Sequence, residues 1–536
     1  MRYAFTVPGE SFLPLIDALV EVNVRVIGTR HEGGASFMAE AYGQLTGRPG
    51  AVLGTRAVGA ANMAIGIQTA REDSTPLFAI AGQVERSLRG RDAFQEADLA
   101  GSIGRLAKWS GEVSEADALP AVVTEAVRQA LGGRPGPVFL SLPEDLLTEM
   151  VPGDAALPGP PRGNGDRPDP GAVHSVLQLL ASASRPVILA GAGVLRARCT
   201  NDLVRLAELL RVPVMAAWRR PDVFPNDHPL YLGMTGYGSP SSVRERLEAA
   251  DALLVLGCRL SEVTSFGYTV PRPGLRWAHA DLAPRAGRNG LHAPDIAVLS
   301  DARAFLRAAI ARLGGSVLDA AVVNARVAAT EADRAAWEAA SIVDDASWEG
   351  PGVHPGRIVA TLRRVLPDNA ILTTDAGNFG GWAARGYRFR RPGTFLGPTS
   401  GAMGYGLPAA IVAALVHRDR PVVALTGDGG FAMTMAELET AVRERARLVA
   451  LVFDNERYGT IRMHQDMADG GRPAGTDLGP IDFAAVARGL GADGVRVEAD
   501  AEFEPALTAA LAADRPTVIH LPLDRRWVSV DHGPGG

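Results

Sequence analysis

Short apolar runs alternate with longer stretches in which apolar residues recur at helical spacing along the whole chain. Such runs are typical of strands buried in a parallel sheet, and the stretches between them are typical of the helices that cover it. The alternation predicts an α/β protein built from doubly wound parallel sheets. The predicted strands cover residues 24–28, 51–54, 77–81 and 138–142, then 186–190, 212–216, 252–257 and 277–280, and finally 370–374, 422–426, 448–453 and 517–521.

Two stretches rich in proline and glycine separate the three groups of strands. Residues 152–170 hold six prolines and four glycines, a composition typical of an extended connector. A second break, GPG at 350–352, follows an alanine-rich helical stretch. We therefore predict three consecutive domains, with a first domain over 1–151, a linker over 152–170, a central domain with a trailing helix over 171–342, and a third domain over 343–536.

The basic residues are almost all arginine, because Lys108 is the single lysine among 54 basic residues. A phosphate-binding loop of the GxxxxGK[ST] type is therefore excluded, and a Schiff base would have to use Lys108. The two cysteines, Cys199 and Cys258, are too few for a disulfide framework or a cysteine-based zinc site.

Charge and hydropathy narrow the possible partners. A net charge of −6 gives no overall basic bias, so we expect no nucleic-acid partner. The first residues lack the pattern of a signal peptide, and no run of 18 apolar residues occurs, so we expect no membrane insertion and a cytoplasmic location.

In the third domain, polar residues follow two successive predicted strands. One strand ends in GDGG at 427–430, and after a helical stretch the next ends in DN at 454–455. Adjacent parallel strands deliver such residues to the same edge of a sheet. Carboxylate and amide oxygens suit Mg²⁺ or Ca²⁺, and the glycines let the backbone approach an anion. The pattern therefore predicts a site for a metal ion and a diphosphate.

This arrangement resembles the thiamine diphosphate-dependent enzymes, in the branch of acetohydroxyacid synthase, pyruvate oxidase and benzaldehyde lyase. In that family an asparagine follows GDG at the spacing found here, 27 residues from Asp428 to Asn455. The resemblance implies that these two side chains bind Mg²⁺ together with the backbone carbonyl of Arg457. Further matching segments are RHEGGA at 30–35, AFQEA at 93–97, FP at 224–225, LGM at 232–234, LGCR at 256–259 and GAMGYGLPAA at 401–410.

The resemblance also implies roles for individual residues. Glu32 would activate the cofactor by sharing a proton with its pyrimidine ring, although taken alone it is more readily explained as a helix-start glutamate. Gln95 of the AFQE segment is a second candidate catalytic residue. Met403 would lie beneath the cofactor, and the backbone at Gly401 and Met403 would bind its pyrimidine. The remaining predicted cofactor-binding residues are Asn378, Gly429, Gly430, Tyr458, Gly459 and Thr460.

Several positions differ from the family pattern and bear on the substrate. His464 stands where acetohydroxyacid synthases present a tryptophan, which argues against a housekeeping synthase of branched-chain amino acids. It is either a proton donor or a surface residue. Glu10 could repel carboxylate substrates, take part in proton transfer, or only start a helix. Phe94 is a further candidate substrate residue, and Lys108 either contacts substrate, supports the active-site loop, or lies where it does by chance. The turn RAVGAAN at 56–62 has lost a Gly-Pro pair of the family.

The resulting hypothesis is a thiamine diphosphate-dependent enzyme that decarboxylates a 2-oxo acid and ligates the resulting carbanion to a second carbonyl compound. The alternatives are a simple 2-oxo acid decarboxylase and a catalytically weak cofactor-binding partner or regulatory protein. The family builds its site from two subunits, which implies a homo-oligomer with active sites at the subunit interface. FAD in the central domain is possible but not favoured, because GAG at 191–193 is only part of a dinucleotide fingerprint.

Overall fold

The structure is a computed structural model, and it describes residues 1–151, 167–284, 292–313, 319–344, 348–468 and 471–532. It contains three six-stranded sheets, each with only parallel pairs, as predicted. We call them sheets A, B and C in chain order, and their carboxyl ends are the edges at which ligands bind in such folds. None of the described helices is both long and apolar enough to cross a membrane.

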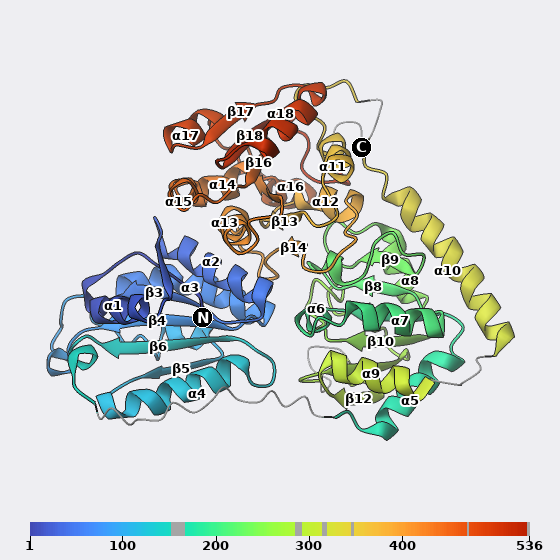
Figure 1. The fold of residues 1–536 in the computed structure, drawn as a ribbon. Helices are drawn as coiled ribbons and strands as arrows, with labels where there is room; N and C mark the ends of the chain where they lie inside the picture. The colour runs from blue at the N-terminus through green and yellow to red at the C-terminus, as the bar shows by residue number, and fades with distance from the viewer. Residues whose placement is uncertain (152–166, 285–291, 314–318, 345–347, 469–470, 533–536) are drawn as a thin grey trace.

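Sheet A lies in the first part of the chain, drawn in blue in Figure 1, and its strands follow the order β2-β1-β3-β4-β6-β5. Its strands are β1 (Tyr3–Thr6), β2 (Arg25–Gly28), β3 (Gly50–Thr55), β4 (Leu77–Gln83), β5 (Trp109–Glu112) and β6 (Pro137–Pro143). Its helices are α1 (Leu13–Glu21), α2 (Glu32–Thr46), α3 (Arg56–Asp73) and α4 (Leu119–Leu131).

Sheet B has the order β12-β11-β10-β7-β8-β9, which reverses at β7 and β10. Its strands are β7 (Pro186–Ala190), β8 (Val214–Ala216), β9 (Tyr231–Met234), β10 (Ala252–Leu256), β11 (Arg276–Asp281) and β12 (Ile296–Leu299). The helices around it are α5 (Pro170–Ser182), α6 (Ala192–Arg196), α7 (Thr200–Leu210), α8 (Ser241–Glu248), α9 (Ala302–Leu313) and the long α10 (Ala320–Ala340).

Sheet C repeats the strand order of sheet A, as β14-β13-β15-β16-β18-β17. Its strands are β13 (Ile371–Thr374), β14 (Phe395–Leu396), β15 (Val422–Gly427), β16 (Val449–Asp454), β17 (Asp493–Arg496) and β18 (Thr517–Pro522). Its helices are α11 (Pro355–Val365), α12 (Gly380–Gly386), α13 (Gly406–Val416), α14 (Asp428–Thr434), α15 (Glu437–Arg443), α16 (Gly459–Met467), α17 (Phe483–Gly489) and α18 (Asp500–Ala512).

The predicted strands are all present, and the strands that the sequence pattern missed lie mostly at sheet edges. The edge strands β5, β9, β12, β14 and β17 have at most four residues each, too short for a clear apolar run. Most of the predicted linker lies outside the described residues. Its last residue, Pro170, is instead the first residue of α5, where proline is favoured because the N–H it lacks would have no helical partner. The domain boundaries themselves stay a prediction.

Helices α2 and α13 join the first and third parts of the chain. Their buried side chains, among them Phe37, Met38 and Leu407, belong to one apolar cluster. Within it the Tyr405 hydroxyl donates a hydrogen bond of 2.6 Å to the Glu40 carboxylate. Burial and the nearby charge of Asp73 raise the pKa of Glu40 to about 7. Because this packing continues one core from α2 to α13, it fixes sheet A relative to sheet C.

Candidate active site

The strand order of sheet C reverses between β13 and β15, and at that point the loops after β13, β15 and β16 enclose a cavity of about 420 Å³. Ligands of doubly wound sheets bind at such reversal points. The lining includes all the residues that the sequence predicted for cofactor and metal in this part of the chain: Asn378, Gly401, Met403, Asp428, Gly429, Gly430, Asn455, Arg457, Tyr458, Gly459 and Thr460. We call this space the diphosphate cavity.

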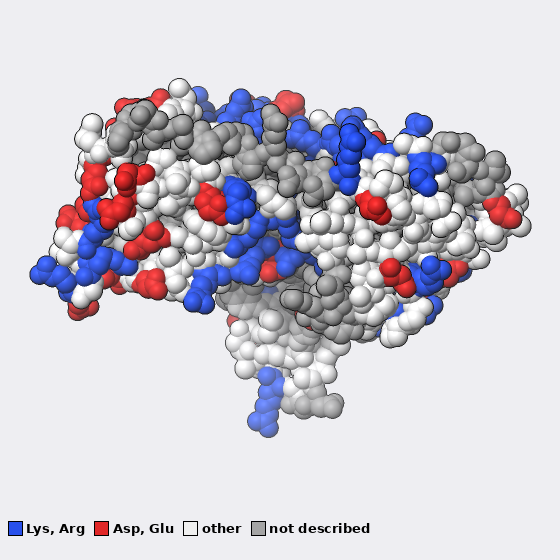
Figure 2. Space-filling model, turned by 90° about the horizontal axis from the view of Figure 1, so that it is seen from below, with Lys and Arg blue, Asp and Glu red and all other residues white. Residues whose placement is uncertain are grey.

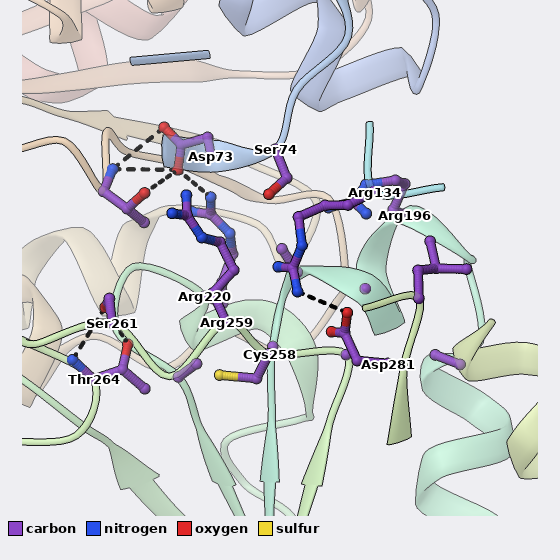
Figure 3. Close-up of a pocket in the computed structure, with 18 of the residues that line it drawn as sticks. Asp73, Ser74, Arg134, Arg196, Arg220, Cys258, Arg259, Ser261, Thr264 and Asp281 are labelled. Atoms are coloured by element: carbon purple, nitrogen blue, oxygen red, sulfur yellow. Dashed lines mark hydrogen bonds and ion pairs between the residues drawn. The ribbon is translucent and has the colours of Figure 1, made fainter. Parts of the chain in front are cut away.

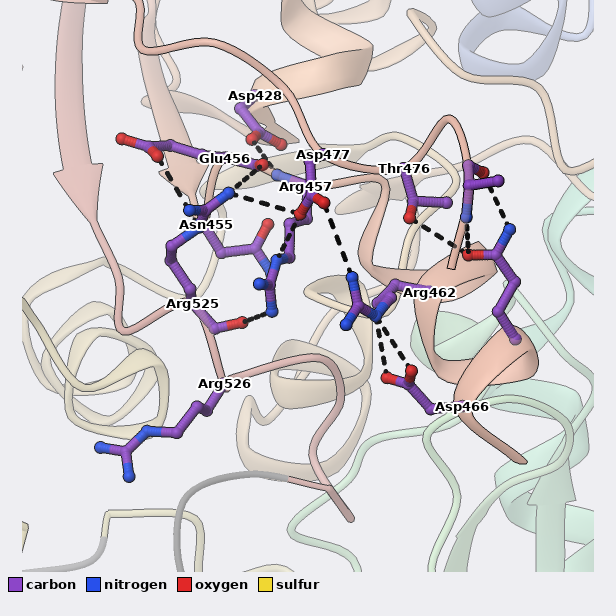
Figure 4. A network of polar contacts seen from close by, with 12 residues as sticks. Asp428, Asn455, Glu456, Arg457, Arg462, Asp466, Thr476, Asp477, Arg525 and Arg526 are labelled. Carbon is purple, nitrogen blue, oxygen red and sulfur yellow. Dashed lines mark hydrogen bonds and ion pairs between the residues drawn. The ribbon is translucent and has the colours of Figure 1, made fainter. Parts of the chain in front are cut away.

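The predicted metal ligands lie next to each other on its wall (Figure 4). The Arg457 N–H donates to Asp428 Oδ2 at 3.1 Å, while the Arg457 guanidinium turns outward to pair with Asp477 at 3.0 Å. Arg457 lines the cavity, and its backbone carbonyl accepts from the Gly459 N–H at 2.9 Å. The amide of Asn455 is oriented by a bond from its Nδ2 to the Trp527 carbonyl at 2.8 Å. The arrangement thus offers a carboxylate, an amide and a carbonyl, the oxygen donors that Mg²⁺ takes.

The electrostatics of Asp428 fit a cation. Its side chain is buried, and among the described residues no basic side chain pairs with it. Burial raises the pKa of Asp428 to about 7, and the neighbouring Asp454 carboxylate adds to the rise. No cluster of three acidic, histidine or cysteine ligands occurs within the described ranges. A cation held here would therefore need further oxygen ligands, such as those of a diphosphate.

The two glycines after Asp428 leave no room for side chains. A Cβ at Gly429 would lie 2.5 Å from the Tyr458 ring, and one at Gly430 would lie 2.5 Å from Asp375 Oδ2. The cavity wall is therefore bare backbone, which allows the close approach that a phosphate group needs.

Asp375, which follows β13, belongs to the same edge but was not predicted from the sequence. It is fully buried and its Oδ1 accepts from the Gly406 N–H at 2.5 Å, while among the described residues its Oδ2 has no hydrogen-bond partner. Burial raises the pKa of Asp375 to about 7. The signal available was the apolar strand that ends at Asp375, which is the same pattern that identified Asp428 after β15.

Glu32 lies at the carboxyl edge of sheet A, as the first residue of α2. Its carboxylate is 7% exposed and accepts a hydrogen bond of 2.9 Å from Asn62 Nδ2 on α3. The turn before it is tied to α15, because the backbone N–H groups of Arg30 and His31 both donate to Glu437 at 3.1 Å. Nevertheless, no residue of 1–151 lines the diphosphate cavity. The structure therefore does not bring Glu32 together with Asp428 and Asn455 in one chain.

Three other predicted residues gather near Arg56 at the edge of sheet A. The Arg56 guanidinium pairs with Glu10 at 3.1 Å and with Glu144 at 2.9 Å, and lies 5.9 Å from the centre of the Phe94 ring. Phe94 itself is 73% exposed. The carbonyl of Gln95 accepts a bond from the Ala57 N–H at 3.3 Å. Sequence reasoning noticed the altered turn at Arg56 but not that its side chain would organise Glu10 and Phe94.

Lys108 does not line the diphosphate cavity of this chain, and its role as a substrate residue stays a prediction. It precedes β5, at the amino end of sheet A, whereas the site residues lie at the carboxyl end. Its ammonium donates to the carbonyls of Gln129, Gly132 and Arg134, between 2.5 and 2.8 Å. These carbonyls lie in the last turn of α4 and just after it, where the helix dipole favours a cation. Lys108 therefore caps α4.

His464 is an exposed residue of α16 and lines a second cavity of about 320 Å³. This cavity shares Asn378, Gly401 and Thr460 with the diphosphate cavity, so the two adjoin. Its other walls come from the loop after β8 and from α12. We call it the second cavity. His464 therefore borders the site, and its role as proton donor or surface residue stays open.

The central sheet carries a third cavity at its own reversal point, between β7 and β10 (Figure 3). Seen from below, basic side chains gather in the hollow between the first and central parts of the molecule (Figure 2). Arg134 and Arg220 of this cavity already pair with Asp281 at 2.8 Å and Asp73 at 2.5 Å. The space measures about 130 Å³, below the range of about 300–1,000 Å³ usual for small-molecule sites. That FAD is not favoured here stays a prediction.

Both family models and individual relatives match this chain. Three models for thiamine pyrophosphate enzymes match in order, the N-terminal TPP binding domain over residues 1–102, the central domain over 173–309 and the C-terminal TPP binding domain over 375–521. The probable acetolactate synthase large subunit of Methanocaldococcus jannaschii is 31% identical, with 100% of this chain and 92% of that protein aligned. The catabolic acetolactate synthase of Raoultella terrigena is 31% identical (98% and 93% aligned). Isozyme 1 large subunit of Escherichia coli acetolactate synthase is 32% identical (97% and 90% aligned).

Proposed function

Because the chain belongs to the family of thiamine pyrophosphate enzymes, we propose that it decarboxylates a 2-oxo acid and joins the remaining fragment to a second carbonyl compound. It is a thiamine diphosphate-dependent carboligase of the acetolactate synthase type. The observation that carries this proposal is the diphosphate cavity, where Asp428 and Asn455 lie beside the bare backbone of Gly429 and Gly430 at the strand reversal of sheet C.

When bound, thiamine diphosphate supplies a nucleophilic carbon for the 2-oxo group and a sink for the negative charge left when CO₂ departs. In this chain Asp428, Asn455 and the Arg457 carbonyl would hold Mg²⁺ against the diphosphate. The half-buried Met403 would support the cofactor between its two rings, and the backbone at Gly401, which adopts a left-handed φ of 74°, would face its pyrimidine.

Glu32 would hold the proton that it shares with the pyrimidine ring. The hydrogen bond from Asn62 and the packing of Gly59, whose added Cβ would lie 3.2 Å from Glu32 Oε1, fix the position of this carboxylate. Gln95 lies on the loop next to Arg56 at the same edge and would face the substrate from there.

The separation of Glu32 from the diphosphate cavity supports an active site shared between two copies of the chain. One copy would supply Glu32 from the edge of sheet A, and the other would supply Asp428 and Asn455 from the edge of sheet C. The exposed Phe94 ring and the Glu10 carboxylate stand at the edge of sheet A, where a second copy would cover them. A homo-oligomer follows from this assignment.

Product analysis tests the proposed function. The purified protein is supplied with thiamine diphosphate, Mg²⁺ and pyruvate, 2-oxobutyrate or benzoylformate, each with and without an added aldehyde or second 2-oxo acid. We expect CO₂ release and a coupled hydroxy-ketone or acetohydroxy acid, detected by mass spectrometry. Release of CO₂ with only the simple aldehyde as product would identify a decarboxylase instead. Absence of CO₂ release from all donors would contradict the proposal.

A further inference from the structure

Glu437 is a buried carboxylate that none of the steps proposed above uses. It is the first residue of α15 and is 1% exposed, and among the described residues no arginine or lysine pairs with it. Burying a carboxylate costs free energy unless hydrogen bonds compensate for the lost water. The groups that donate to Glu437 therefore indicate what it does in the fold.

Two of these donors are backbone N–H groups that come just before Glu32 in the chain. The N–H groups of Arg30 and His31 both donate to Oε1 of Glu437 at 3.1 Å, and the first of them also lies 3.3 Å from Oε2. The hydroxyl of Thr440, on the same helix as Glu437, donates to Oε2 at 2.7 Å. One carboxylate thus joins α15 of the third part of the chain to the turn that leads into α2.

The same carboxylate also packs against the backbone that follows Glu32. A Cβ added at Gly34, in the first turn of α2, would lie 2.5 Å from Oε1 of Glu437. Glu437 therefore contacts the chain on both sides of Glu32, at residues 30–31 before it and at Gly34 after it. The tip of the Glu32 side chain is held separately, by the hydrogen bond of 2.9 Å from Asn62. Backbone and carboxylate are both fixed, so the direction of the side chain is fixed as well.

The other contacts between α15 and this turn involve exposed side chains. The Arg443 guanidinium donates to the carbonyl of Gly28, and the Glu439 carboxylate lies 3.9 Å from the Arg30 guanidinium. Both arginines are exposed, and exposed pairs of charges contribute little to stability. Glu437 is thus the buried contact of α15 with the turn, which makes it the stronger constraint.

We propose that Glu437 is a positioning residue for Glu32, holding the backbone around it so that its carboxylate faces the pyrimidine of a cofactor bound by a second copy of the chain. This inference rests on the proposed function, including the active site shared between copies. Glu437 itself touches neither cofactor nor substrate. Its effect is nevertheless large, because a catalytic group displaced by about 1 Å can lose about 10²-fold in rate.

The place of Glu437 in the chain determines which active site it serves. Helix α14 begins at Asp428, and α15, which begins at Glu437, is the next helix. In the shared arrangement, Asp428 of one copy belongs to one active site, whereas Glu32 of the same copy belongs to another. Glu437 therefore acts on the site that does not contain the Asp428 of its own copy.

The first test follows activation of the cofactor, by NMR measurement of thiazolium C2 proton exchange in the holoenzyme. We expect exchange to be about 10- to 100-fold slower in Glu437→Ala, with the affinity for thiamine diphosphate little changed. Glu437→Asp is too short by one methylene group to reach the turn and should be slow as well, so it serves if the Ala variant does not fold. Glu437→Gln should keep most of the rate, because its oxygen can still accept from both N–H groups and its amide can donate to Thr440.

The matched control is Glu439→Gln, which removes a carboxylate from the same helix without touching the backbone of the turn, and it should exchange at the wild-type rate. Wild-type exchange in Glu437→Ala and Glu437→Asp would overturn the inference. Equal slowing in Glu437→Gln and Glu437→Ala would also overturn it, because the effect would then come from the charge of Glu437 and not from the hydrogen bonds that position Glu32.

The second test determines which active site Glu437 serves, using hybrids that contain one copy of each of two chains and are isolated with two affinity tags. Glu437→Ala paired with Asp428→Asn leaves one site with all groups intact, so we expect about half of the wild-type rate of CO₂ release. The double variant Glu437→Ala/Asp428→Asn paired with the wild-type chain leaves no intact site, so we expect a rate at least about tenfold lower. The opposite order of activities would overturn the inference, because Glu437 would then serve the site of its own Asp428.

Failure of the proposed function gives a different result from failure of this inference. If the wild type releases no CO₂ from any donor, the proposed function fails. The C2 exchange rates of the bound cofactor still decide, without any substrate, whether Glu437 positions Glu32.

Discussion

Sheets A and C have the same strand order but differ in how the charged side chains at their carboxyl edges are paired. Around Arg56 at the edge of sheet A the charges neutralise each other, since Arg56 pairs with both Glu10 and Glu144. At the edge of sheet C the carboxylates of Asp428 and Asp375 are buried, and among the residues described neither pairs with a basic side chain. Topology thus fixes where a site can form, while the loop residues decide whether protein or ligand supplies the opposite charge.

The largest effect on activity is expected from Glu32→Gln at the edge of sheet A. Glutamine keeps a hydrogen bond with Asn62 but cannot share a proton as a carboxylate does. We expect steady-state activity to fall about 10²- to 10⁴-fold with cofactor affinity little changed. The rate at which the thiazolium C2 proton exchanges, followed by NMR, measures activation of the cofactor directly. Unchanged exchange would show that Glu32 is not the activating residue. Glu21→Gln, on the exposed end of α1, is the matched control.

At the edge of sheet C, Asp428→Asn removes the charge that we assign to the metal. We expect the affinity for Mg²⁺ and thiamine diphosphate to fall on the order of 10- to 100-fold. The protein without cofactor should become more stable, because a buried carboxylate without a basic partner is costly. Calorimetric titration checks the loss of affinity for Mg²⁺ and thiamine diphosphate. Thermal unfolding without cofactor checks the gain in stability. Wild-type cofactor affinity in the variant would refute the role of Asp428.

Gly429→Ala tests whether the backbone at the edge of sheet C must be free of side chains. The added methyl group would meet the Tyr458 ring at 2.5 Å, so we expect a loss of about 1–3 kcal/mol in stability, typical of overpacking, and weaker cofactor binding. Gly489→Ala is the control, since nothing lies within 4 Å of a Cβ there. If the two variants behave alike in urea unfolding, the close packing around Gly429 is not needed.

The packing of α2 against α13, which joins sheets A and C, should make the stability of the protein depend on pH through Glu40. Its pKa is raised from 4.5 to about 7 in the folded protein, mainly by burial. The folded state therefore holds a proton that the unfolded state has lost, so the contribution is full below pH 4.5 and is lost as pH rises through about 7. Glu40→Gln should flatten this part of the profile, measured by urea unfolding from pH 5 to 8. A profile unchanged by the substitution would assign the dependence to another group.

The smallest effect should come from Lys108→Met, which removes the cap of α4 far from both edges. We expect stability to fall by about 1 kcal/mol, because three carbonyls lose their donor. Activity should be unchanged in steady-state assays. A marked rise in KM for a 2-oxo acid would instead support Lys108 as a substrate residue. It would also remove the contrast between the two ends of sheet A.

Much of the fold could be predicted from the sequence because central strands of parallel sheets are continuous apolar runs. Strands such as β7 and β16 are buried along their whole length, so their composition identifies them. Edge strands such as β17 (DGVR) are half exposed and carry no such signal. The order of the strands could not be predicted from the apolar runs either, because it depends on contacts between segments that are distant in the sequence.

The site was predictable where residue type and chain position fix the geometry. Asp428 and Asn455 end adjacent strands, so their proximity follows from the parallel sheet. The contacts of Lys108 were not predictable, because the sequence does not show which groups a lone lysine meets, and the end of α4 approaches it only in three dimensions.

The measurement that tests the central claim most directly is complementation between Glu32→Gln and Asp428→Asn, each of which should be nearly inactive alone. If the edge of sheet A in one copy completes the edge of sheet C in another, hybrids formed on co-expression contain one site with both residues intact. Random pairing then predicts about a quarter of wild-type carboligation. Activity no greater than that of the two parents would contradict a site shared between copies of this chain.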